Sequence, residues 1–188
     1  MTFVNYIKSA VFPKDFPQTK LSEIAFAGRS NAGKSSLINS LVNSKIANVS
    51  KTPGKTRLLS FFNYNEEFML VDMPGYGYAA RSDSEVDSWR EMVEGYLNHS
   101  KNLRAIILVM DIRRDWNSEE EQMKMYTDHL GIPLILALTK ADKLSRSQQM
   151  QRIEKIKKSA QLKSIFVCSS LKKTGLEDLK EHLIKKVI

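Results

Sequence analysis

Short apolar runs recur along this chain, and polar segments rich in turn-forming residues separate them. Apolar runs of about four to eight residues between turn signals are typical of buried strands. The run at 104–111 is apolar almost throughout, which indicates a central parallel strand that is covered on both faces. A turn sequence joins 58–62 to 68–71, so these two strands are expected to form a hairpin. The six expected strands cover 24–27, 58–62, 68–71, 104–111, 133–138 and 165–168.

Apolar residues at intervals of three and four predict helices between these strands. The helix at 118–130 begins with the acidic residues Glu119, Glu120 and Glu121, which suit the positive end of the helix dipole. Strands that alternate with helices predict an α/β protein of three layers, in which a mostly parallel six-stranded sheet carries helices on both faces. The expected helices cover 37–42, 85–98, 118–130, 147–162 and 176–187.

The chain length of 188 residues suits one domain with a sizeable core and is too short for two. We expect residues 1–20 to be an N-terminal extension that packs on the domain and is partly a strand, and residues 21–188 to be the single domain. No apolar run reaches the length of a membrane span, and residues 1–8 lack the apolar core of a signal peptide. The single cysteine, Cys168, lies in an apolar run and is expected to be a buried strand residue. A cytoplasmic protein without a membrane partner is therefore expected.

The formal net charge is +8, from 29 Lys and Arg against 21 Asp and Glu. A nucleotide site needs only a few cations, so the excess favours an anionic macromolecular partner, with nucleic acid ahead of a membrane surface. A basic surface that only keeps the protein soluble explains the charge equally well. With three histidines and one cysteine, a metal or redox role has little support.

A glycine-containing segment lies between the first buried strand and the helix that follows it. Its sequence fits G-x-x-x-x-G-K-[ST], the pattern of a loop that binds the phosphates of a nucleoside triphosphate. From average composition, a chance match in a chain of this length has odds of roughly one in a hundred. The segment consists of Gly28, Arg29, Ser30, Asn31, Ala32, Gly33, Lys34, Ser35 and Ser36.

The residue types in this segment suit a triphosphate. Gly28 and Gly33 lack a Cβ, so the backbone there can bend and approach the phosphates. The N–H groups of the loop and of the helix start then direct partial positive charge at the phosphates. Lys34 would reach the β- and γ-phosphates, and the Ser35 hydroxyl would bind Mg²⁺, a hard cation that prefers oxygen ligands.

The strand at 68–71 leads directly into a D-x-x-G pattern formed by Asp72, Met73, Pro74 and Gly75. The carboxylate of Asp72 would hold the water shell of Mg²⁺, and the Gly75 N–H would meet the γ-phosphate. D-x-x-G alone is a weak signal, but here it lies one hairpin after a phosphate loop. The polar loop before that hairpin contains Pro53, Gly54, Lys55 and Thr56.

The base of the nucleotide is indicated after the strand at 133–138, where the sequence fits [NT]-K-x-D. The aspartate, Asp142, can accept hydrogen bonds from the N1–H and the exocyclic amine of guanine, a donor pair that adenine lacks. A base that leaves this carboxylate unpaired binds to the site with lower affinity, so the pattern indicates guanine. The segment consists of Thr139, Lys140, Ala141 and Asp142. A backbone N–H after the last strand can meet the guanine carbonyl oxygen; the residues there are Cys168, Ser169 and Ser170.

Each of these segments follows a strand, where ligands bind in sheets of this kind. Together they resemble the translation-factor-type GTPases and, more closely, the EngB family (also called YihA or YsxC) of bacterial GTPases of ribosome assembly. The resemblance covers nearly the whole chain, and its family-level feature is P-G-Y-G-Y-A at 74–79. The other motifs are at 28–36, 51–56, 139–142 and 169–172.

The resemblance implies a P-loop GTPase domain that binds GTP and GDP and hydrolyses GTP. It implies a role in maturation of the large ribosomal subunit, with contact to rRNA, and a need in normal septation during cell division. It implies Lys34, Thr56 and Gly75 as the catalytic residues. The Mg²⁺ ligands would be Ser35, Thr56 and, through water, Asp72. Thr52 is the second candidate for the position given to Thr56, which we prefer because it precedes an arginine as in related GTPases.

Two further expectations concern turnover. Tyr76 follows Gly75, where many small GTPases carry a glutamine that orients the attacking water, and a phenol ring cannot do this in the same way. We therefore expect slow intrinsic hydrolysis, stimulated by the ribosome. In related GTPases an asparagine at the position of Asn31 helps to hold a potassium ion against the phosphates, so potassium is a second candidate cofactor.

Two other function classes are considered. An ATPase or nucleoside kinase shares the phosphate loop, but Asp142 and its motif argue against that class. A nucleotide-dependent binding module without significant turnover is harder to exclude, because Tyr76 suits a poor catalyst. A monomer is expected, since the sequence shows no exposed heptad pattern.

Overall fold

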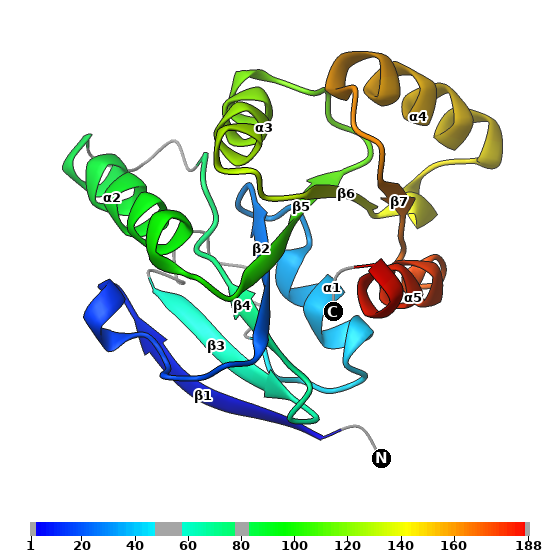
Figure 1. The fold of residues 1–188 in the computed structure, drawn as a ribbon. Coiled ribbons are helices and arrows are strands. Elements are labelled where there is room, and N and C mark those ends of the chain that lie inside the picture. The colour runs from blue at the N-terminus through cyan, green and yellow to red at the C-terminus, as the bar shows by residue number, and fades with distance from the viewer. Residues whose placement is uncertain (1–2, 48–57, 78–82, 187–188) are drawn as a thin grey trace.

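The protein, analysed as a computed structural model, is described here for residues 3–47, 58–77 and 83–186. Its described part is a seven-stranded sheet with helices on both faces (Figure 1). The strands are β1 (Val4–Ala10), β2 (Ser22–Gly28), β3 (Leu59–Tyr64), β4 (Phe68–Asp72), β5 (Leu103–Asp111), β6 (Leu134–Thr139) and β7 (Ile165–Val167). The α-helices are α1 (Lys34–Leu41), α2 (Asp83–His99), α3 (Ser118–Leu130), α4 (Arg146–Ala160) and α5 (Leu176–Lys186). Short 3-10 helices lie at Pro13–Asp15 and Ala141–Lys143.

The strand order across the sheet is β1-β3-β4-β2-β5-β6-β7. The five strands from β4 to β7 in this order run parallel to one another. β3 and β4 form the expected antiparallel hairpin, in which Phe62 pairs with Leu70. The expected three-layer α/β fold with a mostly parallel sheet is confirmed.

The expectation of six strands was one too low, because the N-terminal extension supplies β1. β1 pairs antiparallel with β3, with Val4 opposite Tyr64 and Ala10 opposite Leu59. Most residues of β1 are exposed, so the strand lacks the alternation of apolar and polar residues that marks a strand in a sequence. Pairing with β3 gives partners to backbone groups that would otherwise lie at an open sheet edge. The division of the chain at residue 20 stays a prediction.

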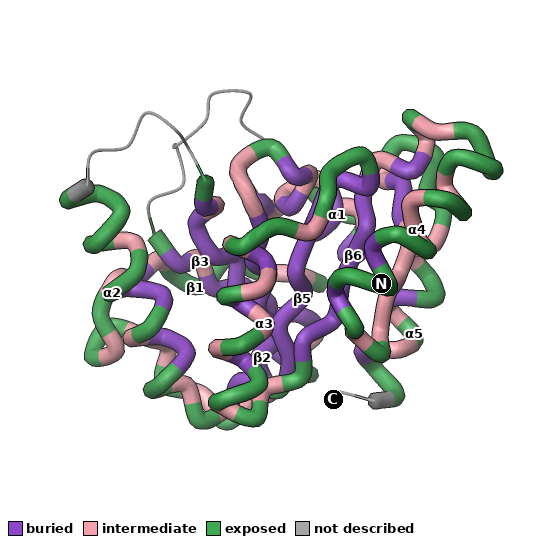
Figure 2. The backbone as a smooth tube through the Cα atoms, turned by 90° about the horizontal axis from the view of Figure 1, so that it is seen from above, coloured by how far each residue is buried: buried purple, intermediate pink, exposed green. Residues whose placement is uncertain are grey.

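The core has two parts, one on each face of the sheet. Alternate residues of β5 point to opposite faces, so Ile106 and Leu108 pack in one cluster and Ile107 and Val109 in the other. The first cluster includes buried side chains of α2, α3 and α4, and the second includes those of α1 and α5. Figure 2 shows the buried central strands between exposed helix surfaces. Within the described ranges, no helix has the length and apolar character that crossing a membrane requires.

Candidate functional site

The site is built at the edge of the sheet where the parallel strands end. β2 ends at Gly28, β4 at Asp72 and β6 at Thr139, and Cys168 directly follows β7. Because β4, β2, β5, β6 and β7 are neighbours in this order, the segments that follow them lie along one edge. This edge is where ligands bind in sheets of this type.

The phosphate loop joins β2 to α1, and its two glycines have structural reasons. A Cβ on Gly28 would lie 2.4 Å from the carbonyl oxygen of Val109, so glycine allows β2 to lie close to β5 here. Gly33 precedes the first residue of α1 with a φ of 98°, a left-handed conformation that favours glycine. Lys34, Ser35 and Ser36 then form the start of the helix, where free N–H groups attract anions.

Lys34 and Asp72 form a buried ion pair between Nζ and Oδ1. They come from adjacent elements, because Asp72 pairs with Phe26 of β2 and Lys34 begins the helix after the loop. A buried charge requires a partner, and each of these residues supplies it for the other. The structure thus places the predicted phosphate lysine beside the predicted magnesium aspartate.

The D-x-x-G segment lies directly against the phosphate loop. The Ser30 N–H donates to the Tyr76 carbonyl oxygen at 2.9 Å, and the Tyr76 N–H donates to the Gly28 carbonyl oxygen at 3.2 Å. A Cβ on Gly75 would lie 3.1 Å from the Ser30 nitrogen, so a side chain there would press on the loop. The backbone of Gly75 is therefore held beside the predicted phosphate site.

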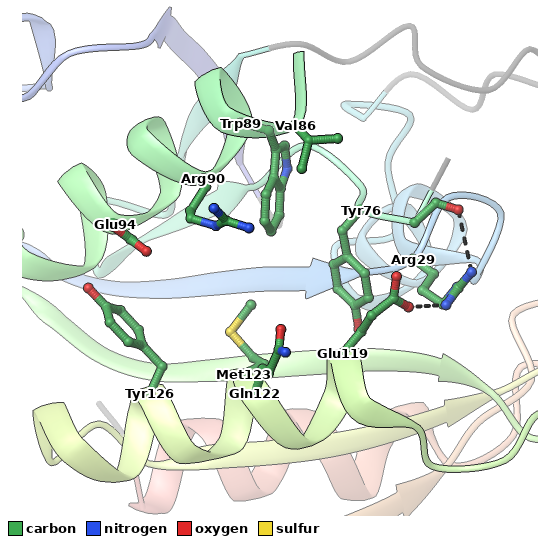
Figure 3. Close-up of a pocket in the computed structure, with 11 residues that line it drawn as sticks. Arg29, Tyr76, Val86, Trp89, Arg90, Glu94, Glu119, Gln122, Met123 and Tyr126 are labelled. Atoms are coloured by element: carbon green, nitrogen blue, oxygen red, sulfur yellow. Dashed lines mark hydrogen bonds and ion pairs between the residues drawn. The ribbon is translucent and has the colours of Figure 1, made fainter. Parts of the chain in front are cut away.

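The Tyr76 side chain is turned toward α3 and is almost fully buried (Figure 3). Its hydroxyl donates to Glu120 Oε1 at 3.0 Å, and its ring packs edge-on against Trp89 with 6.0 Å between centroids. The second carboxylate oxygen of Glu120 accepts the Asn117 N–H at 3.1 Å at the start of α3. Burial, and then the nearby Glu120 carboxylate, raise the pKa of Tyr76 far above its ordinary value. The tyrosine is thus a neutral donor that attaches the D-x-x-G segment to α3.

Arg29 makes a second link between the phosphate loop and α3. Its Nη1 forms an ion pair with Glu119, and its Nη2 lies 3.4 Å from the Gly77 carbonyl oxygen (Figure 3). A Cβ on Gly77 would lie 2.8 Å from the guanidinium carbon of Arg29. Within the described part of the chain, Arg29 Nε is buried and has no hydrogen-bond partner. Two adjacent glutamates of α3 therefore hold the site: Glu119 contacts the phosphate loop and Glu120 contacts the residue after the D-x-x-G segment.

The T-K-x-D segment is also fastened to the phosphate loop. The Thr139 hydroxyl is hydrogen-bonded to the Ala32 carbonyl oxygen. Lys140 has a φ of 58°, and its Nζ donates to the Asn31 carbonyl oxygen at 2.7 Å and lies 3.1 Å from Asp111 Oδ2. Burial raises the pKa of Asp111, but hydrogen bonds from Arg113 and Lys140 outweigh it and bring this pKa to about 2. The lysine therefore joins the T-K-x-D segment to the phosphate loop.

The segment after β7 positions Asp142. The Ser169 hydroxyl donates to Asp142 Oδ1 at 2.6 Å, and the Ala141 N–H donates to the Cys168 carbonyl oxygen at 3.2 Å. Cys168 is fully buried, and this burial raises the pKa of its thiol to about 12, as expected for a structural cysteine. Ser170 is half-buried next to Ser169. The predicted base-binding segments are therefore in contact with each other.

Several predictions fall on residues outside the described ranges. These residues are Thr52, Pro53, Gly54, Lys55 and Thr56. Among the described residues, the roles of Glu119 and Glu120 were missed. Their sequence shows only an acidic first turn, which the helix dipole explains without any contact to the site.

A protein-family model described as "50S ribosome-binding GTPase" matches residues 23–140. The chain is also similar to the "Probable GTP-binding protein EngB" of Bdellovibrio bacteriovorus, with 51% identity over 98% of this chain and 92% of the relative. The protein of the same name from Alkaliphilus metalliredigens is 46% identical over 92% of this chain and 85% of its own length.

Two solved structures show the same architecture. A crystal structure of a probable GTP-binding protein engB has a TM-score of 0.73 at 25% identity, over 87% of this chain and 97% of the other. A structure of Era in complex with MgGDPNP and nucleotides 1506–1542 of 16S ribosomal RNA has a TM-score of 0.71 at 26% identity. It covers 91% of this chain and 58% of the Era chain.

Proposed function

The chain belongs to the EngB family of GTP-binding proteins, and from this premise we propose that it is a slow GTPase that acts as a switch in assembly of the large ribosomal subunit. The observation that carries the proposal is the contact of the phosphate loop with both the D-x-x-G and the T-K-x-D segments at one sheet edge. Such an arrangement can bind the phosphates, the metal and the base of one nucleotide at the same time.

The proposed base site is formed by the segments after β6 and β7. Asp142 would accept the two hydrogen bonds of guanine, and its Oδ1 is already oriented by Ser169. Lys140 would lie along the base while it braces the phosphate loop. Backbone groups supply the remaining contacts in this proposal; their residues are Thr139, Ala141, Cys168, Ser169 and Ser170.

The proposed phosphate and metal site is formed by the loop 28–36 and the D-x-x-G segment. A carboxylate and a helix-start hydroxyl, from Asp72 and Ser35, are oxygen donors that fit Mg²⁺. Lys34 would move its ammonium from Asp72 to the β- and γ-phosphates, which leaves the carboxylate for the water shell of the metal. When bound, Mg²⁺ neutralises charge on the phosphates. Thr56 is proposed as a further ligand and catalytic residue, and backbone contacts are proposed for Arg29, Ser30, Asn31, Ala32, Gly33, Ser36, Pro53, Gly54, Lys55, Met73, Pro74 and Gly75.

Slow turnover is supported by the position of Tyr76. Its hydroxyl is bonded to Glu120 and its ring packs on Trp89, so this side chain is directed away from the phosphate loop. No water-orienting side chain is then supplied by the position after Gly75. Stimulation by the ribosome is part of the proposal.

Potassium is proposed as an additional activator through the side-chain amide of Asn31, which is exposed. The backbone oxygen of the same residue already accepts a hydrogen bond from Lys140, which holds the residue in place. Replacement of potassium by sodium should lower turnover in the presence of ribosomal subunits; unchanged turnover would refute this role.

The proposed partners are GTP or GDP, the large ribosomal subunit and its rRNA. We also propose that the protein is a cytoplasmic monomer and that normal septation requires it. The domain is proposed to comprise residues 21–188, with residues 1–20 as the extension that supplies β1.

The base assignment is tested by binding of a fluorescent GTP analogue to the wild type and to Asp142→Asn, with GTP, ATP and xanthosine triphosphate as competitors. An asparagine amide can donate to the C2 oxygen of xanthine, whereas aspartate only accepts. We expect the variant to change its preference from guanine to xanthine. Equal binding of ATP and GTP by the wild type would overturn the proposed function.

The second candidate function is a nucleotide-dependent binding module without significant turnover. The anchored Tyr76 favours it, because a site without a water-orienting group can bind GTP and not hydrolyse it. Single-turnover hydrolysis with and without large ribosomal subunits separates the two. Absence of product in both conditions would establish the binding module.

A further inference from the structure

The net positive charge of the chain is confined to its last quarter. Residues 140–188 contain 13 Lys and Arg against 5 Asp and Glu, whereas residues 1–139 contain 16 of each. The net charge of +8 therefore belongs entirely to the segment that begins after β6. A basic composition that served only solubility would not require this separation.

The same segment forms one end of the sheet. β7 is the edge strand at this end, and β1 is the edge strand at the other. α4 packs in the core cluster on one face and α5 in the cluster on the opposite face. Figure 1 shows α4, β7 and α5 together at this end, away from β1 and α2. The excess charge is therefore concentrated in space as well as in sequence.

Some cations at this end have internal functions. Lys140 contacts Asp111, and Arg152 donates to Asp115 Oδ1 at 2.8 Å and to the Ile112 carbonyl oxygen at 2.9 Å. Other cations at this end are exposed and form no ion pair with another described residue; they are Arg146, Lys158, Lys163, Lys172 and Lys173. We call these five residues the basic end. Two of them lie on α4, one lies before β7 and two lie after the segment 168–170 that follows β7. They therefore extend along the side of the sheet that β7 forms, which β5 and β6 separate from β2 and the phosphate loop.

We propose that the basic end binds the phosphate backbone of RNA, an inference that rests on the proposed ribosomal role and names the surface for it. Arg146 and Lys158 lie near the two ends of α4, and their separation of twelve residues gives about 18 Å along the helix at 1.5 Å per residue. Cations spread over such a distance can contact several phosphates of one nucleic acid and release their counterions. Large exposed apolar residues at this end are isolated, at Met150, Leu171 and Ile184. A membrane-surface helix needs a continuous apolar face beside its cations, so RNA fits better than a lipid surface.

The test compares two variants of equal charge. In the first, Arg146, Lys158, Lys163 and Lys173 are each replaced by Gln; Lys172 is kept because it belongs to the motif at 169–172. In the control, the same replacement is made at four exposed lysines outside the basic end; they are Lys8, Lys14, Lys20 and Lys101. Each variant removes four charges and so lowers the net charge from +8 to +4. The probe is a fluorescent 20-base-pair RNA duplex, titrated by anisotropy at several salt concentrations.

We expect the wild type and the control to bind the duplex alike, within about threefold, and the basic-end variant to bind at least tenfold more weakly. The dependence of log affinity on log salt should become shallower by about one unit for each phosphate that the variant no longer binds. Equal losses of affinity in both variants, or no binding by the wild type, would overturn the proposal. So would stronger binding of the wild type to phosphatidylserine vesicles than to the duplex.

Binding of GTP and single-turnover hydrolysis are measured on the same preparations. None of the eight replaced residues is in the proposed nucleotide site, so both variants should match the wild type in these assays. If the wild type binds GTP but does not bind the RNA duplex, the RNA-binding role of the basic end is refuted and the proposed GTPase function is not. If the wild type does not bind GTP, the proposed function is refuted, and the comparison of RNA affinities still decides whether the basic end binds RNA.

Discussion

Replacement of Tyr76 by Phe should uncouple the D-x-x-G segment from α3 while it keeps the ring that packs on Trp89. Without the hydroxyl, the buried Glu120 loses its donor at Oε1 and keeps the Asn117 N–H at Oε2. The loss of a hydrogen-bond donor to a buried charged acceptor costs about 1–3 kcal/mol of stability. We therefore expect the free energy of unfolding to fall by about 2 kcal/mol, as measured by urea denaturation.

The chain contains a matched control in Tyr96. Its hydroxyl donates to Glu23 Oε2 at 2.7 Å, and the same oxygen accepts from Ser100 at 2.7 Å, so Tyr96→Phe removes one of two donors to a buried glutamate. This pair joins α2 to β2 at the opposite end of the strand from the phosphate loop. The two variants should therefore lose similar stability.

They should differ in hydrolysis. In the variant, the two backbone hydrogen bonds of Tyr76 to Gly28 and Ser30 remain as the contacts that hold this segment to the phosphate loop. Loss of the side-chain anchor to α3 should therefore let Tyr76 and the adjacent Gly75 move. A displacement of about 1 Å at a reacting group can cost up to a hundredfold in rate, so we expect Tyr76→Phe to slow single-turnover hydrolysis by about tenfold. Tyr96→Phe should stay within about twofold of the wild type. Equal rates in the two variants, at nucleotide saturation and at a temperature where both are folded, would refute the positioning role of the tyrosine anchor.

Two further predictions concern stability. The pKa of Asp111 is lowered to about 2 in the folded state, so its contribution, on the order of 1–2 kcal/mol, should be present above pH 4 and be lost as the pH falls toward 2. Urea denaturation across this range should show the loss in the wild type, and an identical pH profile in Asp111→Asn would contradict the assignment. Gly175→Ala places a Cβ 1.9 Å from the Val167 carbonyl oxygen, whereas Gly131→Ala has the same φ of 68° and no atom within 4 Å. Thermal unfolding should show a cost of about 1 kcal/mol for Gly131→Ala and at least about 2 kcal/mol more for Gly175→Ala; equal costs would exclude the steric explanation.

Much of the fold was predictable because its signals are local. The continuous apolar run at 104–111 became β5, and alternate residues of that strand do pack on both faces. The sequence also predicted where the loop motifs lie, since each is a short pattern that directly follows a strand. The burial of Cys168 followed from its apolar neighbours. Periodicity and short motifs depend on residues a few positions apart, so they are present in the chain before it folds.

Other features depend on residues that are distant in the sequence. β1 has mostly exposed side chains, and it is a strand because β3, about 55 residues later, offers a free edge. Tyr76 meets Glu120 across 44 positions, and Arg29 meets Glu119 across 90. Nothing in the local pattern of an acidic helix turn distinguishes a glutamate that faces water from one that anchors a loop. Such contacts form only where the packing of the sheet and its helices brings the two side chains together, because hydrogen bonds and ion pairs act over a few ångströms in space and not along the chain.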